Sequence, residues 1–159
     1  MTTTKSTPTT VIRDLMARLR HSARAEEKNP HKHVMLLAIG AVLELDPSHP
    51  NRFTFQEIEP VFLEQFQSLF PSWPTARRHL EYPFYHLQHD GCWHLQLKAG
   101  MQPLFERYEQ TRLTRNRLME TVSFGYLDEA IYDALGTAEG RAFLEQSVLL
   151  WFSGDKDVR

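Results

Sequence analysis

The spacing of hydrophobic residues predicts a chain that is mostly helical. Apolar residues recur at helical intervals just after Thr10, which would serve as the N-cap: Val11, Ile12, Leu15, Met16 and Leu19. Residues 31–44 are apolar on nearly every side, which indicates a central buried helix. Thr54 and Glu57 have the spacing of a capping box that opens a third helix. We expect Pro60 to kink or split that helix.

The second half of the chain contains the one convincing β signal. Residues 82–88 and 92–97 read as two strands, joined by a tight turn at 89–91 that contains Gly91. Three further helices are predicted at 112–122, 126–135 and 137–152, separated by residues 123–125 and Gly136. The expected fold is therefore mainly α with one small β-hairpin, a winged-helix-like single domain over residues 11–153. Residues 1–10 read as a flexible N-terminal tail, and residues 154–159 as the start of a linker or tail.

Composition fits one globular domain. The 159 residues are 42% hydrophobic and 24% charged, which is enough apolar material for a core. The single cysteine, Cys92, excludes an internal disulfide and every zinc motif built on several cysteines. No apolar run is long enough to cross a bilayer, and the Thr-rich start lacks the apolar segment of a signal peptide, so we expect a cytoplasmic protein.

The formal net charge of −2 conceals alternating blocks. Residues 1–33 carry +4, residues 34–70 carry −4, residues 71–120 carry +2 and residues 121–159 carry −4. A fold that brings the two basic blocks together would present a positive face. A mixed, solvated surface explains the same numbers, and charge alone favours it.

Two groups of histidines are candidate sites. His31, Lys32 and His33 follow Pro30 at a helix start, where free backbone N–H groups and the lysine favour an anion. A phosphate contact and an ordinary helix start are equally compatible with them, whereas metal binding is disfavoured because i and i+2 do not share a helix face. His86, His89 and His94 lie around the predicted hairpin and are better explained as surface residues than as zinc ligands.

The sequence predicts no catalytic site, no metal and no cofactor. It has no Gly-rich phosphate loop, no nucleophile elbow and no metal-finger context around its asparagines. The most unusual string is Tyr82-Pro83-Phe84-Tyr85. It is either a segment that enters the core or a rigid apolar pocket.

Taken together, these strings resemble the sulfur-binding domain of McrA-like HNH restriction endonucleases, over roughly residues 10–153. The likeness rests on Asn29-Pro30-His31-Lys32, on Tyr82–Trp93 with its Asp90-Gly91 turn, on the Ser-Phe-Gly-Tyr-Leu-Asp segment at 123–128 and on Phe152. His33 stands where many members have proline. The resemblance implies recognition of double-stranded phosphorothioate-modified DNA, in which sulfur replaces one non-bridging phosphate oxygen, and a nuclease domain or partner that follows the chain.

The resemblance also implies roles for particular residues. An apolar sulfur pocket would be formed by Tyr82, Pro83, Phe84 and Tyr85, and His31 and Lys32 would contact the modified phosphate. A base-reading loop is expected at Ser123, Phe124, Gly125 and Tyr126. Ordinary phosphates would be bound by Arg77, Arg78, Arg112, Arg115 and Arg117.

Three other functions are compatible with parts of the sequence. A winged-helix regulator would bind unmodified DNA through a recognition helix, so that sulfur would make no difference to its affinity. A protein-interaction adaptor would use exposed Trp73, Phe84 and Trp151. A histidine-based metalloenzyme would contain bound metal when purified.

Overall fold

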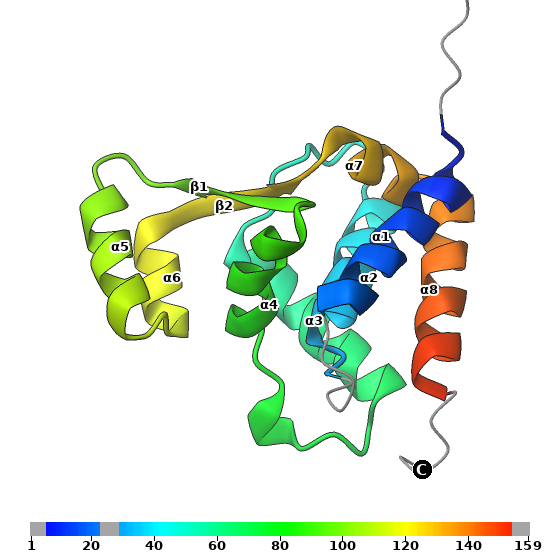
Figure 1. Ribbon diagram of the computed structural model, residues 1–159, viewed down its shortest axis with the longest axis horizontal. Coiled ribbons are helices and arrows are strands. Elements are labelled where there is room, and N and C mark those ends of the chain that lie inside the picture. The colour runs from blue at the N-terminus through cyan, green and yellow to red at the C-terminus, as the bar shows by residue number, and fades with distance from the viewer. Residues whose placement is uncertain (1–5, 23–28, 154–159) are drawn as a thin grey trace, which may run out of the picture.

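The computed structural model describes residues 6–22 and 29–153. Within them, eight α-helices accompany one two-stranded antiparallel sheet, which confirms the predicted mainly α class with a small sheet (Figure 1). The winged-helix-like arrangement stays a prediction. The elements are α1 (Pro8–Ser22), α2 (His31–Leu45), α3 (Phe55–Leu69), η1 (Thr75–Arg77), α4 (Glu81–His86), η2 (Leu87–Asp90), β1 (Trp93–Leu97), α5 (Gln102–Thr111), α6 (Arg115–Thr121), β2 (Val122–Leu127), α7 (Glu129–Leu135) and α8 (Ala138–Ser153). Residues 1–5 of the predicted N-terminal tail and the whole predicted C-terminal tail, 154–159, lie outside the described residues, whereas residues 8–10 belong to α1.

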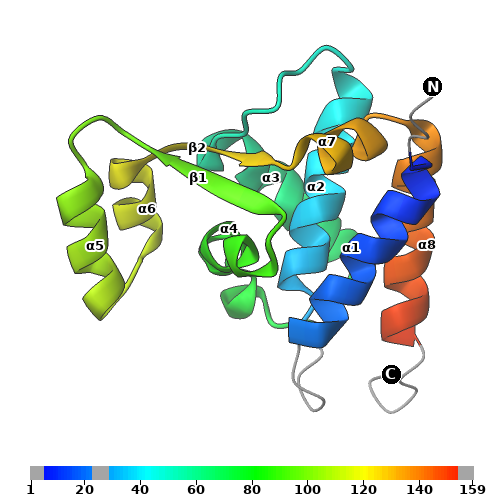
Figure 2. The same cartoon turned by 45° about the horizontal axis from the view of Figure 1, so that its top comes forward.

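Helix α2 forms the centre of a helical body. It packs against α3, α4 and α8, and α1 covers α7 and α8 (Figure 2). The prediction of a central buried helix is confirmed, because ten of its residues are buried. No helix within the described ranges is long and apolar enough to span a membrane.

Two helix starts show what local rules predicted and what they missed. The capping box is present: the Thr54 side chain accepts the Glu57 N–H at 3.2 Å, and Glu57 Oε2 accepts the Thr54 N–H at 2.7 Å. Helix α3 nevertheless runs unbroken through Pro60. The proline removes only one hydrogen bond of the helix, the one to the carbonyl of the exposed residue Gln56. Helix α1 begins at Pro8 rather than after Thr10, since proline suits a first helical turn.

The predicted strand at 82–88 is wrong, because this segment forms α4 and η2. Leu80, Phe84 and Leu87 are all buried, and their spacing is that of one helix face. Pro83 sits in the first turn of α4, where its missing N–H costs no hydrogen bond. Gly91 then ends η2 with a left-handed φ of 76°.

The strand that pairs with β1 is β2, which comes from a segment predicted as a loop and a helix start. The strands are antiparallel, with Trp93 opposite Leu127 and Gln96 opposite Phe124, and an irregularity follows Gln96. Helices α5 and α6 lie between them in sequence and project from the helical body at the far end of the sheet (Figure 1). The sheet is thus no tight hairpin. Of the three later helices, α6 begins at Arg115, α7 begins at Glu129, and α8 covers almost all of its predicted range.

Gly125 sets the approach of β2 to the core. A Cβ at this position would lie 1.9 Å from Cζ2 of the fully buried Trp93. On the other edge, Phe53 and Gly125 exchange two backbone hydrogen bonds of 2.8 Å. The Trp93 indole donates to the Phe84 carbonyl at 2.8 Å, so the sheet is tied to α4 through this ring.

Replacing Gly125 with alanine is expected to lower the free energy of unfolding by about 3 kcal/mol, because an added methyl group must displace a packed indole. Urea denaturation followed by tryptophan fluorescence measures the change. The matched control is Gly40→Ala, where the new Cβ would meet only the Arg141 side chain at 3.5 Å and helix propensity improves. Equal effects of the two substitutions would contradict the packing role of Gly125.

Candidate functional site

Two segments singled out in the sequence, the start of α2 and helix α4, lie side by side. The Tyr82 ring lies 6.1 Å from the His31 ring and 4.6 Å from the His86 ring, centroid to centroid. Lys32 reaches Asp90 at the end of η2. We call Lys32, Tyr82, His86 and Asp90 the α2–α4 site.

His31 is a buried residue that contacts this site through the Tyr82 ring. Its ring is buried between Phe66, at 4.9 Å, and Trp73, at 5.8 Å between centroids. The ring nitrogens contact the side-chain carbonyl of Asn29 and the backbone carbonyl of Arg77. Burial lowers the pKa of His31, and the hydrogen bond to the Arg77 carbonyl only partly offsets this. His31 is predicted as a phosphate contact, but only 4% of its surface is exposed, and its ring packs against Tyr82.

Lys32 is held by a buried carboxylate. Its Nζ donates to Asp90 Oδ2 at 2.7 Å, and the Asp90 side chain is fully buried while that of Lys32 is 16% exposed. The other oxygen of Asp90 has no hydrogen-bond partner among the described residues. The ion pair therefore holds the ammonium at the edge of the core, and part of the Lys32 side chain still reaches solvent.

The string Tyr82–Tyr85 divides between the surface and the core because it is helical. The Tyr82 ring is 44% exposed, and Tyr85 donates to Glu109 Oε2 at 2.6 Å. Burial and this hydrogen bond raise the pKa of Tyr85 to about 12, so the phenol stays protonated. Pro83 and Phe84 are buried, and Phe84 packs on Phe55 at 5.2 Å. Of the four residues predicted for the sulfur pocket, Tyr82 and Tyr85 thus have surface that a ligand can reach, whereas Pro83 and Phe84 are buried. An adaptor surface that uses an exposed Phe84 is wrong for the same reason.

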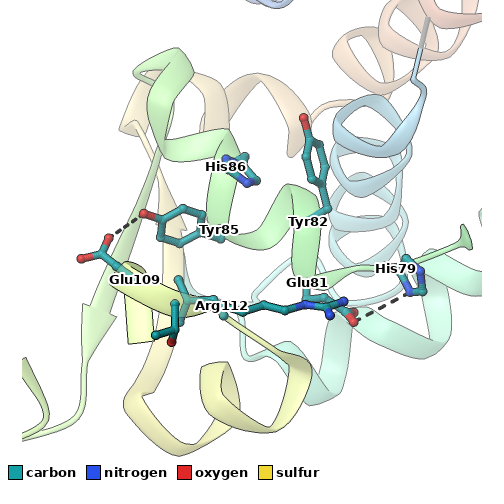
Figure 3. A pocket seen from close by; sticks show the side chains of 9 residues that line it. His79, Glu81, Tyr82, Tyr85, His86, Glu109 and Arg112 are labelled. Carbon is teal, nitrogen blue, oxygen red and sulfur yellow. Dashed lines mark hydrogen bonds and ion pairs between the residues drawn. The ribbon is translucent and has the colours of Figure 1, made fainter. Parts of the chain in front are cut away.

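A cavity of about 430 Å³ lies between α4 and the end of α5 (Figure 3). It is lined by His79, Glu81, Tyr82, Tyr85, His86, Glu109, Thr111, Arg112 and Leu113. His86 is half-buried here, and its pKa is lowered by burial and by nearby His89 and Lys32, against the opposing effect of Asp90. Sequence reasoning missed His86 and Asp90 as site residues. Treating 82–88 as a helix would have placed His86 on the face of Tyr82, four residues away.

The five arginines predicted to bind phosphates differ in their burial and in the hydrogen bonds that they already make within the protein. Arg78 is buried and bonds to Gln67 Oε1 and to the carbonyls of Trp73 and Pro71, so little of its guanidinium is available to a phosphate. Arg115 is engaged by Glu59 through two guanidinium nitrogens at 2.7–3.1 Å.

The other three arginines stay closer to the prediction. Arg117 donates to the Arg112 carbonyl and lies over the Tyr108 ring. Arg77 and Arg112 are exposed, and Arg112 also lines the cavity.

The predicted base-reading loop is a strand. Ser123, Phe124, Gly125 and Tyr126 all belong to β2, and Gly125 is buried behind Trp93. Phe124 and Tyr126 instead share one sheet face with His94, whose ring lies 5.1 Å from that of Tyr126. Side chains of this segment can contact DNA only from a rigid surface.

The remaining histidines do not gather into a metal centre. The ring centroids of His86 and His89 lie 5.4 Å apart. His94 lies on the sheet instead, where its Nε2 is hydrogen-bonded to Asp128 Oδ1 at 2.6 Å. His33 is buried against Phe152, at 5.1 Å between centroids. In the described part of the chain, no three potential ligands come together. Burial raises the pKa of the Cys92 thiol to about 12, so it is unreactive at neutral pH.

Comparison with known families identifies the chain. The sequence model of the ScoMcrA-like DNA sulfur-binding domain matches residues 9–153. The chain belongs to this family, which confirms the resemblance seen in the sequence, and the family is one of DNA-binding domains rather than catalytic ones. No curated protein matches the sequence.

The buried ion pair makes a prediction about stability. Lys32→Met leaves the Asp90 carboxylate buried without its cation and is expected to lower the free energy of unfolding by about 3 kcal/mol. Adding Asp90→Asn should cost much less than the sum of the single changes. Urea denaturation of the four proteins measures this coupling. The exposed pair Glu59 and Arg115 is the control, with a coupling below about 1 kcal/mol. Additive effects at Lys32 and Asp90 would contradict the assignment.

Two histidines are expected to titrate in opposite directions from the ordinary value of 6.5. His31 should titrate below 6.5, because burial disfavours its charge, so its contribution to stability is lost as the pH falls. His49 is raised above 6.5: burial opposes its charge, but its hydrogen bonds to Glu57 and the Pro50 carbonyl outweigh this. Its contribution is lost as the pH rises through its folded pKa. NMR titration of the ring protons measures both. A His31 midpoint above that of His49 would contradict these environments.

Proposed function

We propose that the α2–α4 site binds a phosphorothioate in double-stranded DNA, with the sulfur against the Tyr82 ring and the remaining oxygen toward Lys32. Membership of the sulfur-binding family supports the ligand class. The observation that carries the proposal is the exposed Tyr82 ring against His86, with the Lys32 ammonium, which Asp90 holds, acting on the same His86 ring. These two features match the two unlike atoms of the ligand.

The difference between sulfur and oxygen explains how such a site discriminates. Sulfur is larger, softer and more weakly hydrated, so contact with an aromatic ring costs it little. A phosphate oxygen in the same place loses its water without gaining a hydrogen bond. Specificity then arises mainly from the penalty on the unmodified ligand. Lys32 attracts either ligand and contributes affinity rather than choice.

The rest of the interface is assigned by charge and exposure. Arg77 and Arg112 are placed to bind ordinary phosphates, with Arg117 as a further candidate. The face of β2 that carries Phe124 and Tyr126 is the proposed base-reading surface. We further propose that the domain targets a modification-dependent restriction endonuclease, with cleavage supplied by a separate nuclease domain or partner.

The test compares two duplexes of one sequence, with and without a single phosphorothioate, in each diastereomer. The chain is expected to bind one modified duplex far more tightly, in fluorescence anisotropy at one salt concentration. Tyr82→Ala should lower the ratio of the two affinities about tenfold, because it removes the apolar contact to sulfur.

The matched control is Tyr126→Ala, an exposed tyrosine on the sheet whose loss should leave the ratio unchanged even if both affinities fall. Circular dichroism confirms that both variants fold. Equal affinities of the wild-type chain for all duplexes would instead identify a reader of unmodified DNA.

A further inference from the structure

We propose that His86 determines the specificity of the α2–α4 site: as a neutral ring it forms the surface that accepts sulfur, and as a cation it accepts phosphate oxygen equally well. This inference rests on the proposed function. It makes recognition of the modification dependent on pH, through one residue whose charge changes near neutrality.

The position of His86 supports a direct role. It lies four residues after Tyr82 on α4, and the two ring centroids are 4.6 Å apart, so the rings form one continuous surface. Both residues line the cavity between α4 and α5, and Figure 3 shows both side chains extending from the same helix. A group resting on Tyr82 at this end of α4 therefore meets His86.

The charged groups around His86 decide its state. Lys32 on α2 and His89 on η2 oppose a positive charge on the ring, as does burial, whereas Asp90 favours it. Across the cavity, Glu109 is engaged by Tyr85, the Glu81 carboxylate lies 3.8 Å from the His79 ring, and Arg112 adds positive charge. The ring is therefore neutral at pH 7 to 8 in the free protein. An incoming phosphate group adds a negative charge and favours protonation as the pH falls.

The two protonation states suit different ligands. A neutral imidazole contacting the ligand through its ring gives oxygen little in exchange for lost water. A protonated imidazole offers charged N–H donors, which strengthen hydrogen bonds to oxygen more than to sulfur, a poor acceptor. Both affinities rise on protonation, but the affinity for unmodified DNA rises more. The ratio of affinities is thus expected to fall as the pH falls.

The experiment measures this ratio between pH 5.5 and 8.5 at constant ionic strength, with the paired duplexes. Because both duplexes carry the same charge throughout this range, titrating groups that do not touch the substituted atom affect both affinities alike and cancel in the ratio. For the wild-type chain we expect the ratio to fall about tenfold from pH 8.5 to 5.5, the size of one gained charge-assisted hydrogen bond.

Three variants isolate His86. His86→Phe retains a ring and cannot ionise, so its ratio should stay high and flat with pH. His86→Lys carries a permanent charge, so its ratio should be low and flat. His86→Gln provides a second neutral side chain if the phenylalanine variant folds poorly, and its ratio should also be flat. The matched control is His79→Gln, a histidine of the same cavity that leaves the Tyr82–His86 contact in place, so the wild-type pH dependence should persist.

The outcomes separate the two proposals. A wild-type ratio near one at every pH would overturn the proposed function and this inference with it. A high ratio that does not change with pH, or a pH dependence that survives in His86→Phe and His86→Gln, would overturn only the role of His86.

Discussion

The α2–α4 site depends on the burial of Phe84 against Trp93. The two rings pack edge to face at 5.5 Å, and the Trp93 indole donates to the Phe84 carbonyl. Once Phe84 faces the core, helical geometry forces Tyr82 and His86 toward solvent, on the side where α2 begins. Gly125 makes the arrangement possible, since only a residue without a side chain leaves room for the indole. The exposed aromatic surface is thus a consequence of how the core is packed.

The ion pair between Lys32 and Asp90 is the second feature on which the site depends. Asp90 lies at the end of η2, one residue before the turn at Gly91, and its buried carboxylate fixes Lys32 at the start of α2. Holding a cation in place removes the entropy that a free lysine would lose on binding a phosphate. The same carboxylate also reduces the net charge of the site. In the proposed complex this limits the affinity for phosphate in general, and the contact with the substituted atom would have more influence on which DNA is bound.

Much of the fold could be predicted from the sequence where a pattern had a single physical interpretation. The all-round apolar α2 and the Thr54–Glu57 capping box are examples. The segment 82–88 was ambiguous, because a short run of aromatic residues with one proline suits either a strand or a first helical turn. The segment forms a helix in the folded protein, where Phe84 packs against Trp93. The strand β2 could not be found locally, since its partner lies across two intervening helices and its central Gly125 resembles a turn residue.

The difference between what residue patterns and three-dimensional contacts reveal also applies to the residues of the proposed site. Lys32 and Tyr82 were named from the family resemblance, and the structure brings their segments together. Phe84 and Arg78 come from the same resemblance, which says nothing of burial in this chain, and both are buried. His86 and Asp90 emerged only from the helical geometry and the ion pair. Residue type thus indicated the chemistry of the site, while the three-dimensional contacts determined its members.

The most direct test of the account is phosphorus NMR of a duplex that carries one phosphorothioate, whose resonance is well separated from those of ordinary phosphates. Adding the wild-type chain at pH 8 is predicted to shift that resonance strongly. The Tyr82→Ala variant, added at a concentration high enough to saturate the DNA, should shift the phosphorothioate resonance much less. It should still shift the resonances of the neighbouring phosphates. A shift of the same size with both proteins would contradict the account, because the sulfur would then rest on some other surface of the domain.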